Sequence, residues 1–188
     1  TFYQLPEATT LDRWAESVGG SFLFSVKASR YITHMKELLD PREPVANFLG
    51  RVRNLGHKLG PVLFQLPPNW KANPGRLSAF LSVLPEDLRY VFEFRDPSWF
   101  VDEVYRELEK KQTAFCIYDL AGTQSPLEIT ADFVYLRLHG PGDAYQGQYD
   151  ESTLREWARR LERWVQEGKE SGYAPQDAMR LKRKVGQE

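Results

Sequence analysis

Short apolar runs separated by longer polar or amphipathic stretches set the organisation of this chain. Within each run, side chains alternate between two faces, and Val, Phe and Leu occur on both, which predicts strands covered by helices. Between the runs, apolar residues recur three or four positions apart, as on one side of a helix. The predicted strands are residues 22–28, 61–68, 90–95, 114–119 and 131–140.

Predicted helices follow these strands with few exceptions. They cover residues 11–18, a segment from residue 45, residues 76–84, residues 102–112, a segment capped by Asp150 or Ser152, and a segment from about Pro175. Connections of this length join parallel strands, so the alternation predicts an α/β fold. The two candidates are a (β/α) TIM-barrel-like parallel barrel and an open doubly wound sheet. No dinucleotide-binding glycine fingerprint and no Walker loop follows any strand.

Polar side chains stand at the carboxyl end of every predicted strand. They are Lys27, Gln65, Glu93 with Arg95, Asp119, and Arg137 with His139. The carboxyl ends of barrel strands converge on one mouth, where barrel enzymes hold their active sites. We therefore expect these residues to form one functional site. For the two charges on the central strand, the alternative is a buried ion pair that only closes the barrel end.

The cationic members of this set favour an anionic ligand. Lys27, Arg95 and Arg137 suit a phosphate or a carboxylate, because arginine in particular offers two parallel hydrogen bonds to such groups. Gln65 adds a neutral amide at the same level. We assign these four residues to substrate binding.

The remaining members can exchange protons. Glu93, Asp119 and His139 are candidate catalytic residues, acting as general acid or base. The same three could ligate Mn, Mg or Zn. This alternative is disfavoured because the cations nearby would repel a metal and no HxH or HExxH spacing occurs. We therefore assign no metal ligands, and the cofactor stays unassigned.

A glycine-rich, aromatic loop follows the last predicted strand, over residues 139–149. The last strand–helix loops of barrels often hold phosphate, so Gly140 could present a backbone amide to an anion. Tyr145 could stack on a sugar or a base. An ordinary flexible loop is the alternative for this segment.

Bulk composition narrows the class of partner. The net charge is −1 with a pI of about 6.3, so no global basic field for nucleic acid exists, although a local patch remains an alternative. The single cysteine, Cys116, rules out an internal disulfide framework, which fits a reducing compartment. No apolar run approaches membrane-spanning length. We expect a cytoplasmic protein that binds a small anionic ligand and no membrane, with its oligomeric state unassigned.

Five segments in chain order carry a family resemblance. They are FYQLP at 2–6, FSVKA at 24–28, GPVLFQLPP at 60–68, FEFRDPSW at 92–99 and YLRLHGP at 135–141. The chain resembles the YecE-like family, a family built on a domain of unknown function, number 72. The resemblance implies a TIM-barrel-like fold and a bacterial or archaeal cytoplasmic protein, with no settled activity.

The chain departs from that family pattern in two places. The opening strand with a GTSGW-type motif is absent before Thr1, and a last strand is absent between Gly168 and Gly172. We therefore expect a single (β/α) barrel domain over residues 1–188, seen without its first and last strands.

Three functions fit this pattern. The first is an enzyme acting on a phosphorylated or otherwise anionic small molecule, with hydrolase, lyase or isomerase-type chemistry all open. The second, by analogy of fold alone, is a metal-dependent phosphodiesterase or a nucleic-acid-binding barrel. The third is a non-catalytic ligand-binding protein.

Overall fold

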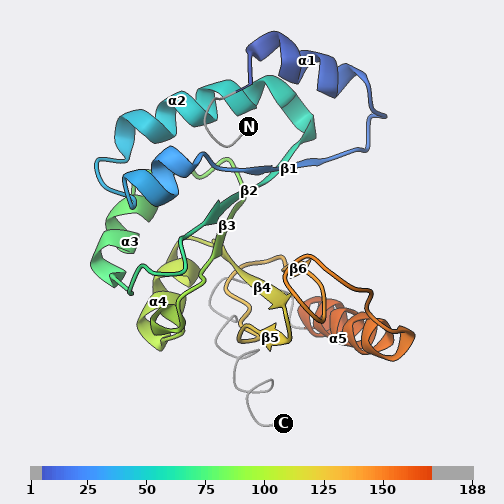
Figure 1. Cartoon of the computed structure of the whole chain (residues 1–188). Coiled ribbons are helices and arrows are strands. Elements are labelled where there is room, and N and C mark those ends of the chain that lie inside the picture. The colour runs from blue at the N-terminus through green and yellow to red at the C-terminus, as the bar shows by residue number, and fades with distance from the viewer. Residues whose placement is uncertain (1–5, 171–188) are drawn as a thin grey trace. The chain divides into compact units, whose positions relative to one another are not determined.

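The structure, a computed structural model, describes the backbone of residues 6–170 and the side chains of residues 6–168 (Figure 1). Its contacts divide the chain into two compact units, one up to Thr113 and one from Ala114. Each unit combines strands with helices. No helix in the described part of the chain is long and apolar enough to cross a membrane.

The first unit contains three strands: β1 (Phe24–Lys27), β2 (Leu59–Gln65) and β3 (Tyr90–Glu93). Its α-helices are α1 (Ala8–Glu16), α2 (Arg42–Val52), α3 (Pro74–Leu81) and α4 (Asp102–Lys110). Three short helices complete it: the π-helix η1 (Tyr31–Met35) and the 3-10 helices η2 (Arg53–Lys58) and η3 (Pro97–Trp99). Both strand pairs, β1–β2 and β2–β3, are parallel, as the connection lengths predict.

Aromatic side chains fill the space between β2, β3 and α3. Phe64 pairs with Phe92 across the two strands, and their rings stack with centroids 5.2 Å apart. Phe80 of α3 meets Phe64 edge to face at 5.0 Å, and all three side chains are fully buried. Alternation along the strands then sends Gln65 and Glu93 to the opposite face. One face of the strands is therefore apolar and packs against α3, and the other face carries the polar side chains.

The second unit is built on β4 (Ala114–Leu120), with β5 (Thr123–Gln124), β6 (Tyr135–Leu138) and the helix α5 (Glu151–Glu170). β6 lies parallel to β4, as predicted, whereas β5 lies antiparallel to it and was not predicted. Ala121 and Gly122 form the turn, and both have positive φ, 51° and 72°. Such two-residue hairpin turns usually have Asn or Gly at their first position. Because Ala121 stands there, the sequence does not show the usual pattern of a hairpin turn.

The strand predicted over residues 131–140 is shorter than expected, because β6 begins only at Tyr135. Upstream, the backbone N–H of Phe115 donates to Oγ1 of Thr130 at 2.8 Å, and Thr130 is buried. A side chain thus satisfies a strand N–H that a longer β6 would have paired. Apolar alternation alone does not reveal this replacement.

Several helix boundaries also differ from the prediction. α2 begins at Arg42, ahead of Pro44, because a proline in the first turn lacks only an N–H that has no helical partner there. The polar stretch before it contains η1, which was not predicted. α1 begins at Ala8, so Thr9 and Thr10 lie inside the helix and do not cap it.

The long helix α5 begins at its predicted cap. Asp150 accepts a hydrogen bond from the backbone N–H of Thr153 at 2.7 Å. Along the helix, Trp157 and Trp164 are buried, whereas Leu154 and Val165 are exposed.

The break predicted between Gly168 and Gly172 lies at the end of the described residues. α5 continues through Gly168 to Glu170, so Gly168 does not end the helix. Gly172, the expected missing strand and the helix predicted from Pro175 lie outside the described residues.

Replacing Phe92 with alanine should lower the free energy of unfolding by about 3–5 kcal/mol, because its ring is fully buried against three other aromatic rings. Chemical denaturation measures the loss. Phe22→Ala is the matched control, since that ring is 47% exposed, and should cost less than half as much. Equal losses would contradict the aromatic core described above.

Candidate functional site

The carboxyl ends of β1, β2 and β3 place three of the predicted side chains on one face. Gln65 is paired in register with Glu93, and Lys27 with Leu63, two residues before Gln65. Paired residues in parallel strands point to the same side, and so do residues two apart on one strand. Lys27, Gln65 and Glu93 therefore share the face opposite the aromatic core.

These side chains form a continuous hydrogen-bonded row that ends on Arg95. Lys27 Nζ donates to Oε1 of Gln65, whose Nε2 donates to Oε1 of Glu93 at 3.0 Å. Arg95 Nη2 contacts the same oxygen of Glu93 as an ion pair. The side chain of Glu93 is 0% exposed and that of Arg95 is 9% exposed. Glu93 is thus paired with a cation, as in the alternative interpretation of these two charges, and burial makes each charge depend on its partner.

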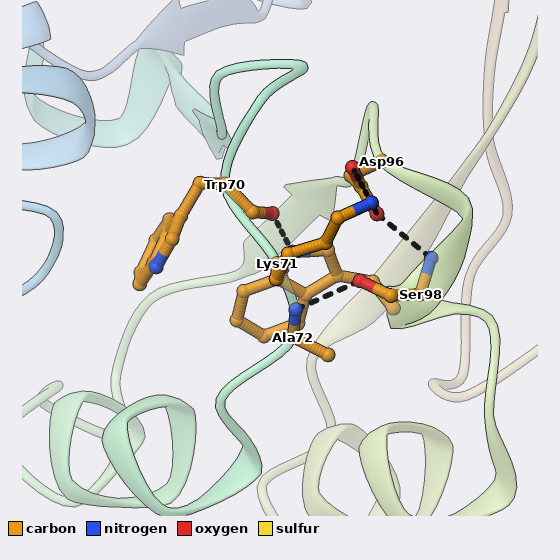
Figure 2. Close-up of polar contacts among 6 residues, drawn as sticks. Trp70, Lys71, Ala72, Asp96 and Ser98 are labelled. Carbon is orange, nitrogen blue, oxygen red and sulfur yellow. Dashed lines mark hydrogen bonds and ion pairs between the residues drawn. The ribbon is translucent and has the colours of Figure 1, made fainter.

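A clasp between two loops lies just beyond the ends of β2 and β3 (Figure 2). Asp96 accepts from the backbone N–H of Ser98 at 2.9 Å and forms an ion pair with Lys71 at 3.0 Å. Ser98 Oγ accepts from the backbone N–H of Ala72 at 2.8 Å. The indole N–H of Trp99 donates to the carbonyl of Trp70 at 2.7 Å. Three of these contacts join the loop after β2 to the loop after β3, and the fourth, between Asp96 and Ser98, lies within the second loop.

The clasp lowers the pKa of Asp96. Hydrogen bonds from Ser98, followed by the contact with Lys71, lower the pKa of this carboxyl from 3.8 to about 2. Asp96 also caps η3, where the positive end of the helix favours a carboxylate. The sequence offered a signal here, because Asp-Pro-Ser is a turn-initiating combination. Nothing in the sequence pointed to Lys71.

His34 lies closer to the site than the sequence suggested. It belongs to η1, directly after β1, and its Nδ1 is 2.8 Å from Oγ1 of Thr33. Burial, and then the charges of Arg30 and Lys27, lower the pKa of His34 below 6.5. The imidazole is therefore neutral at pH 7 and within electrostatic reach of Lys27.

In the second unit, the predicted residues occupy the carboxyl ends of the parallel pair β4–β6. Asp119 is paired with Leu138, whereas Arg137 is paired with Tyr118, one position earlier. Asp119 and Arg137 therefore leave the strands on opposite faces. His139 is buried, and its backbone N–H donates to the carbonyl of Asp119 at 2.8 Å. Oδ1 of Asp119 is buried, and no residue in the described part of the chain hydrogen-bonds to it.

The loop after β6 depends on Gly140. Its φ is 107°, and a Cβ there would overlap the backbone of Gln146, so the position accepts only glycine. The N–H of Gly140, expected to face an anion, donates to Oη of Tyr149 at 3.0 Å. Tyr145 is 70% exposed and meets the ring of His139 edge to face at 5.1 Å. Burial is the largest cause that raises the pKa of Tyr149, so its hydroxyl is neutral.

Metal ligation was the alternative interpretation of the acidic residues and His139. Among residues 6–168, no group of three or more His, Cys, Asp or Glu side chains is arranged so that it could hold an ion.

Comparison with known proteins first places the fold. The chain matches the crystal structure of a DUF72 family protein from Thermotoga maritima with a TM-score of 0.74 and 25% identity, over 88% of this chain and 71% of that one. A DUF72 family protein from Enterococcus faecalis matches with a TM-score of 0.74 and 17% identity, over 100% and 87%. This protein thus has a mixed α/β fold with a mostly parallel sheet, like its TIM-barrel-like structural neighbours.

Sequence comparison then gives the family. The family described as protein of unknown function DUF72 matches residues 1–188, so the chain belongs to it, as the motifs predicted. The UPF0759 protein YecE of Escherichia coli K12 is 33% identical over 103 residues, 53% of this chain. The same protein of Escherichia coli O157:H7 matches equally. The matched segment spans 37% of the length of these curated relatives.

Glu93→Gln should lower the free energy of unfolding by about 3–5 kcal/mol, because it removes the buried carboxylate that forms an ion pair with Arg95. The double variant Glu93→Gln with Arg95→Met should cost about 1–3 kcal/mol less than the sum of the single changes. Denaturant titration of all four proteins gives this coupling energy.

An exposed ion pair serves as the control for that cycle. Glu151 and Arg155 on α5 have side chains 79% and 66% exposed, and their coupling should be about 0.5 kcal/mol or less. A coupling for Glu93 and Arg95 no larger than this would show that burial does not strengthen the pair.

Asp96→Asn should remove a pH-dependent part of the stability. The folded carboxyl has the lower pKa, so its ionised form favours folding above about pH 4, and that contribution disappears as the pH falls towards 2. The stability gap between wild type and variant should therefore shrink between pH 4 and pH 2. Urea unfolding across this range measures the gap, and a constant gap would contradict the assigned role of the clasp.

Proposed function

We propose that this protein is an enzyme acting on a phosphorylated or otherwise anionic small molecule at the carboxyl ends of its strands. The row from Lys27 through Gln65 and Glu93 to Arg95 carries the proposal. Three successive parallel strand ends supply it, and this is the level at which α/β proteins bind their ligands. Its side chains are held by one another, which lowers the cost of ordering them around a ligand.

The charge of the row supports an anion as ligand. Two cations and one carboxylate leave a net charge of +1, and Arg30 adds a further cation within electrostatic reach of His34. Lys27 is exposed, so its ammonium can meet a solute, whereas the mostly buried Arg95 is fixed by Glu93. A neutral His34 beside these cations would gain affinity for a proton once an anion binds.

Proton transfer is the second part of the proposal. In the first unit, Glu93 is the candidate acid or base, and its contacts fix the position of one oxygen. In the second unit, Asp119 and His139 are the candidates, since Oδ1 of Asp119 is a buried acceptor. A buried acceptor that lacks a donor within the described residues is a natural place for the proton of a ligand or of water. Each of the three residues is a candidate general acid or base within its own unit.

A thermal-shift screen with inorganic phosphate and sugar phosphates tests the proposal. At least one of them should raise the Tm of the wild-type protein, because a ligand that binds only the folded state stabilises it by mass action. Lys27→Met should weaken that ligand about tenfold by removing a charge-assisted contact.

The control for this variant is Lys110→Met, which removes an exposed lysine on α4. It should leave the affinity unchanged, and all samples should share one ionic strength. Absence of any shift in wild type, or equal losses in the two lysine variants, would refute the proposed anion site.

A further inference from the structure

The second unit contains an open pocket of about 530 Å³ beside the loop that follows β6. Its lining comes from the end of β6, this loop and the start of α5. The residues are Leu138, His139, Gly140, Tyr145, Gly147, Gln148, Tyr149 and Leu154. None of these described lining residues carries an Asp, Glu, Lys or Arg side chain, in contrast with the row in the first unit. The pocket therefore suits an uncharged ligand.

Backbone hydrogen bonds hold the pocket in shape. The N–H of Tyr145 donates to the carbonyl of His139 at 2.6 Å, and the N–H of Gln146 donates to the carbonyl of Asp143 at 3.0 Å. Tyr149 accepts from the N–H of Gly140 and so joins the far end of the loop to its start. Tyr145 has a φ of 64°, an uncommon conformation for a tyrosine, and it displays 70% of its surface. The loop thus presents an aromatic ring to solvent at the pocket wall.

The lining combines apolar surface with neutral polar groups. Tyr145 and Leu154, both exposed, supply apolar surface to the lining. The amide of Gln148 can both donate and accept, and the imidazole of His139 offers a further polar edge. A ligand that matches both features has an apolar ring face and several neutral hydroxyl groups. A sugar ring has these properties.

A nucleobase fits the same lining less well. Bases favour stacking on, or between, parallel aromatic planes. Here the rings of Tyr145 and His139 stand at 81° to each other, so they do not form a parallel pair that could enclose a base. One accessible ring instead offers a one-sided platform, on which the C–H face of a sugar can pack.

We propose that this pocket binds a neutral monosaccharide unit, with its ring packed on Tyr145 and its hydroxyl groups on Gln148 and His139. The site lies wholly within the second unit and involves no cation. It shares His139 with the proton-transfer candidates named above, but it shares no residue with the row of Lys27, Gln65, Glu93 and Arg95 in the first unit, so sugar binding and anion binding can each fail without the other.

Saturation-transfer NMR on the whole chain tests this site with glucose, galactose, N-acetylglucosamine and, as the competing class, adenosine. At least one sugar should receive saturation, with a Kd on the order of millimolar. Tyr145→Asn should weaken it about tenfold or more, because asparagine tolerates positive φ but supplies no ring. Tyr145→Phe should stay within about threefold of wild type, since it keeps the ring.

Tyr31→Ala is the control, because it removes another exposed tyrosine from the first unit and should not change sugar binding. If Tyr145→Asn fails to fold, Gln148→Ala replaces it, with the same expected loss. No transfer to any sugar at about 50 mM would overturn the proposal. So would transfer to adenosine alone, or sugar binding that neither Tyr145→Asn nor Gln148→Ala weakens.

Discussion

A carboxylate without solvent exposure is the constraint around which the first unit is arranged. Glu93 has to be compensated where it stands, and the molecule does this with Gln65 from β2 and Arg95 from the chain just beyond β3. The compensation works only if β2 and β3 keep their register, because a shift by one residue would turn Glu93 into the aromatic core. The same register stacks Phe64 on Phe92. One alignment of two strands therefore satisfies a buried charge on one face and closes an apolar core on the other.

The clasp between Lys71, Ala72, Asp96 and Ser98 fixes the two loops that follow β2 and β3. Loops that follow parallel strands are usually the more mobile part of such folds, yet they carry the ligand-binding groups. Here Asp96 and Ser98 tie the loop after β3 to Lys71 and Ala72 after β2, two residues on each side. Because Asp96 follows Arg95 directly, the clasp also limits where the guanidinium can go. The position of the Arg95 side chain thus depends on the hydrogen bonds of the next residue, Asp96.

The sequence predicted the parts of this structure that depend on local periodicity and missed those that depend on contacts between distant segments. Alternation located β2, β3 and β4 and assigned Gln65, Glu93 and Arg95 to one level, because parity along a strand is a local property. The relative register of β4 and β6, which separates Asp119 from Arg137, is not local, and neither is the contact of Thr130 with Phe115. The π-helix that brings His34 near Lys27 has no simple periodic signature. The sequence therefore predicted which strand carries each candidate residue. It did not predict which side chains of the second unit share a face of the sheet.

The energy of the buried Glu93–Arg95 ion pair helps to explain why charged residues occur at the carboxyl end of β3. An ion pair withdrawn from water gains little over apolar side chains of similar volume, since desolvation offsets most of the attraction. Phe64 and Phe92, together with Phe80 of α3, show that this chain fills the interior space on the other face of the same strands with apolar side chains. Stability alone would be served as well by an apolar pair at Glu93 and Arg95. Their position at the carboxyl ends, in a row that reaches the exposed Lys27, therefore supports the anion site that we propose.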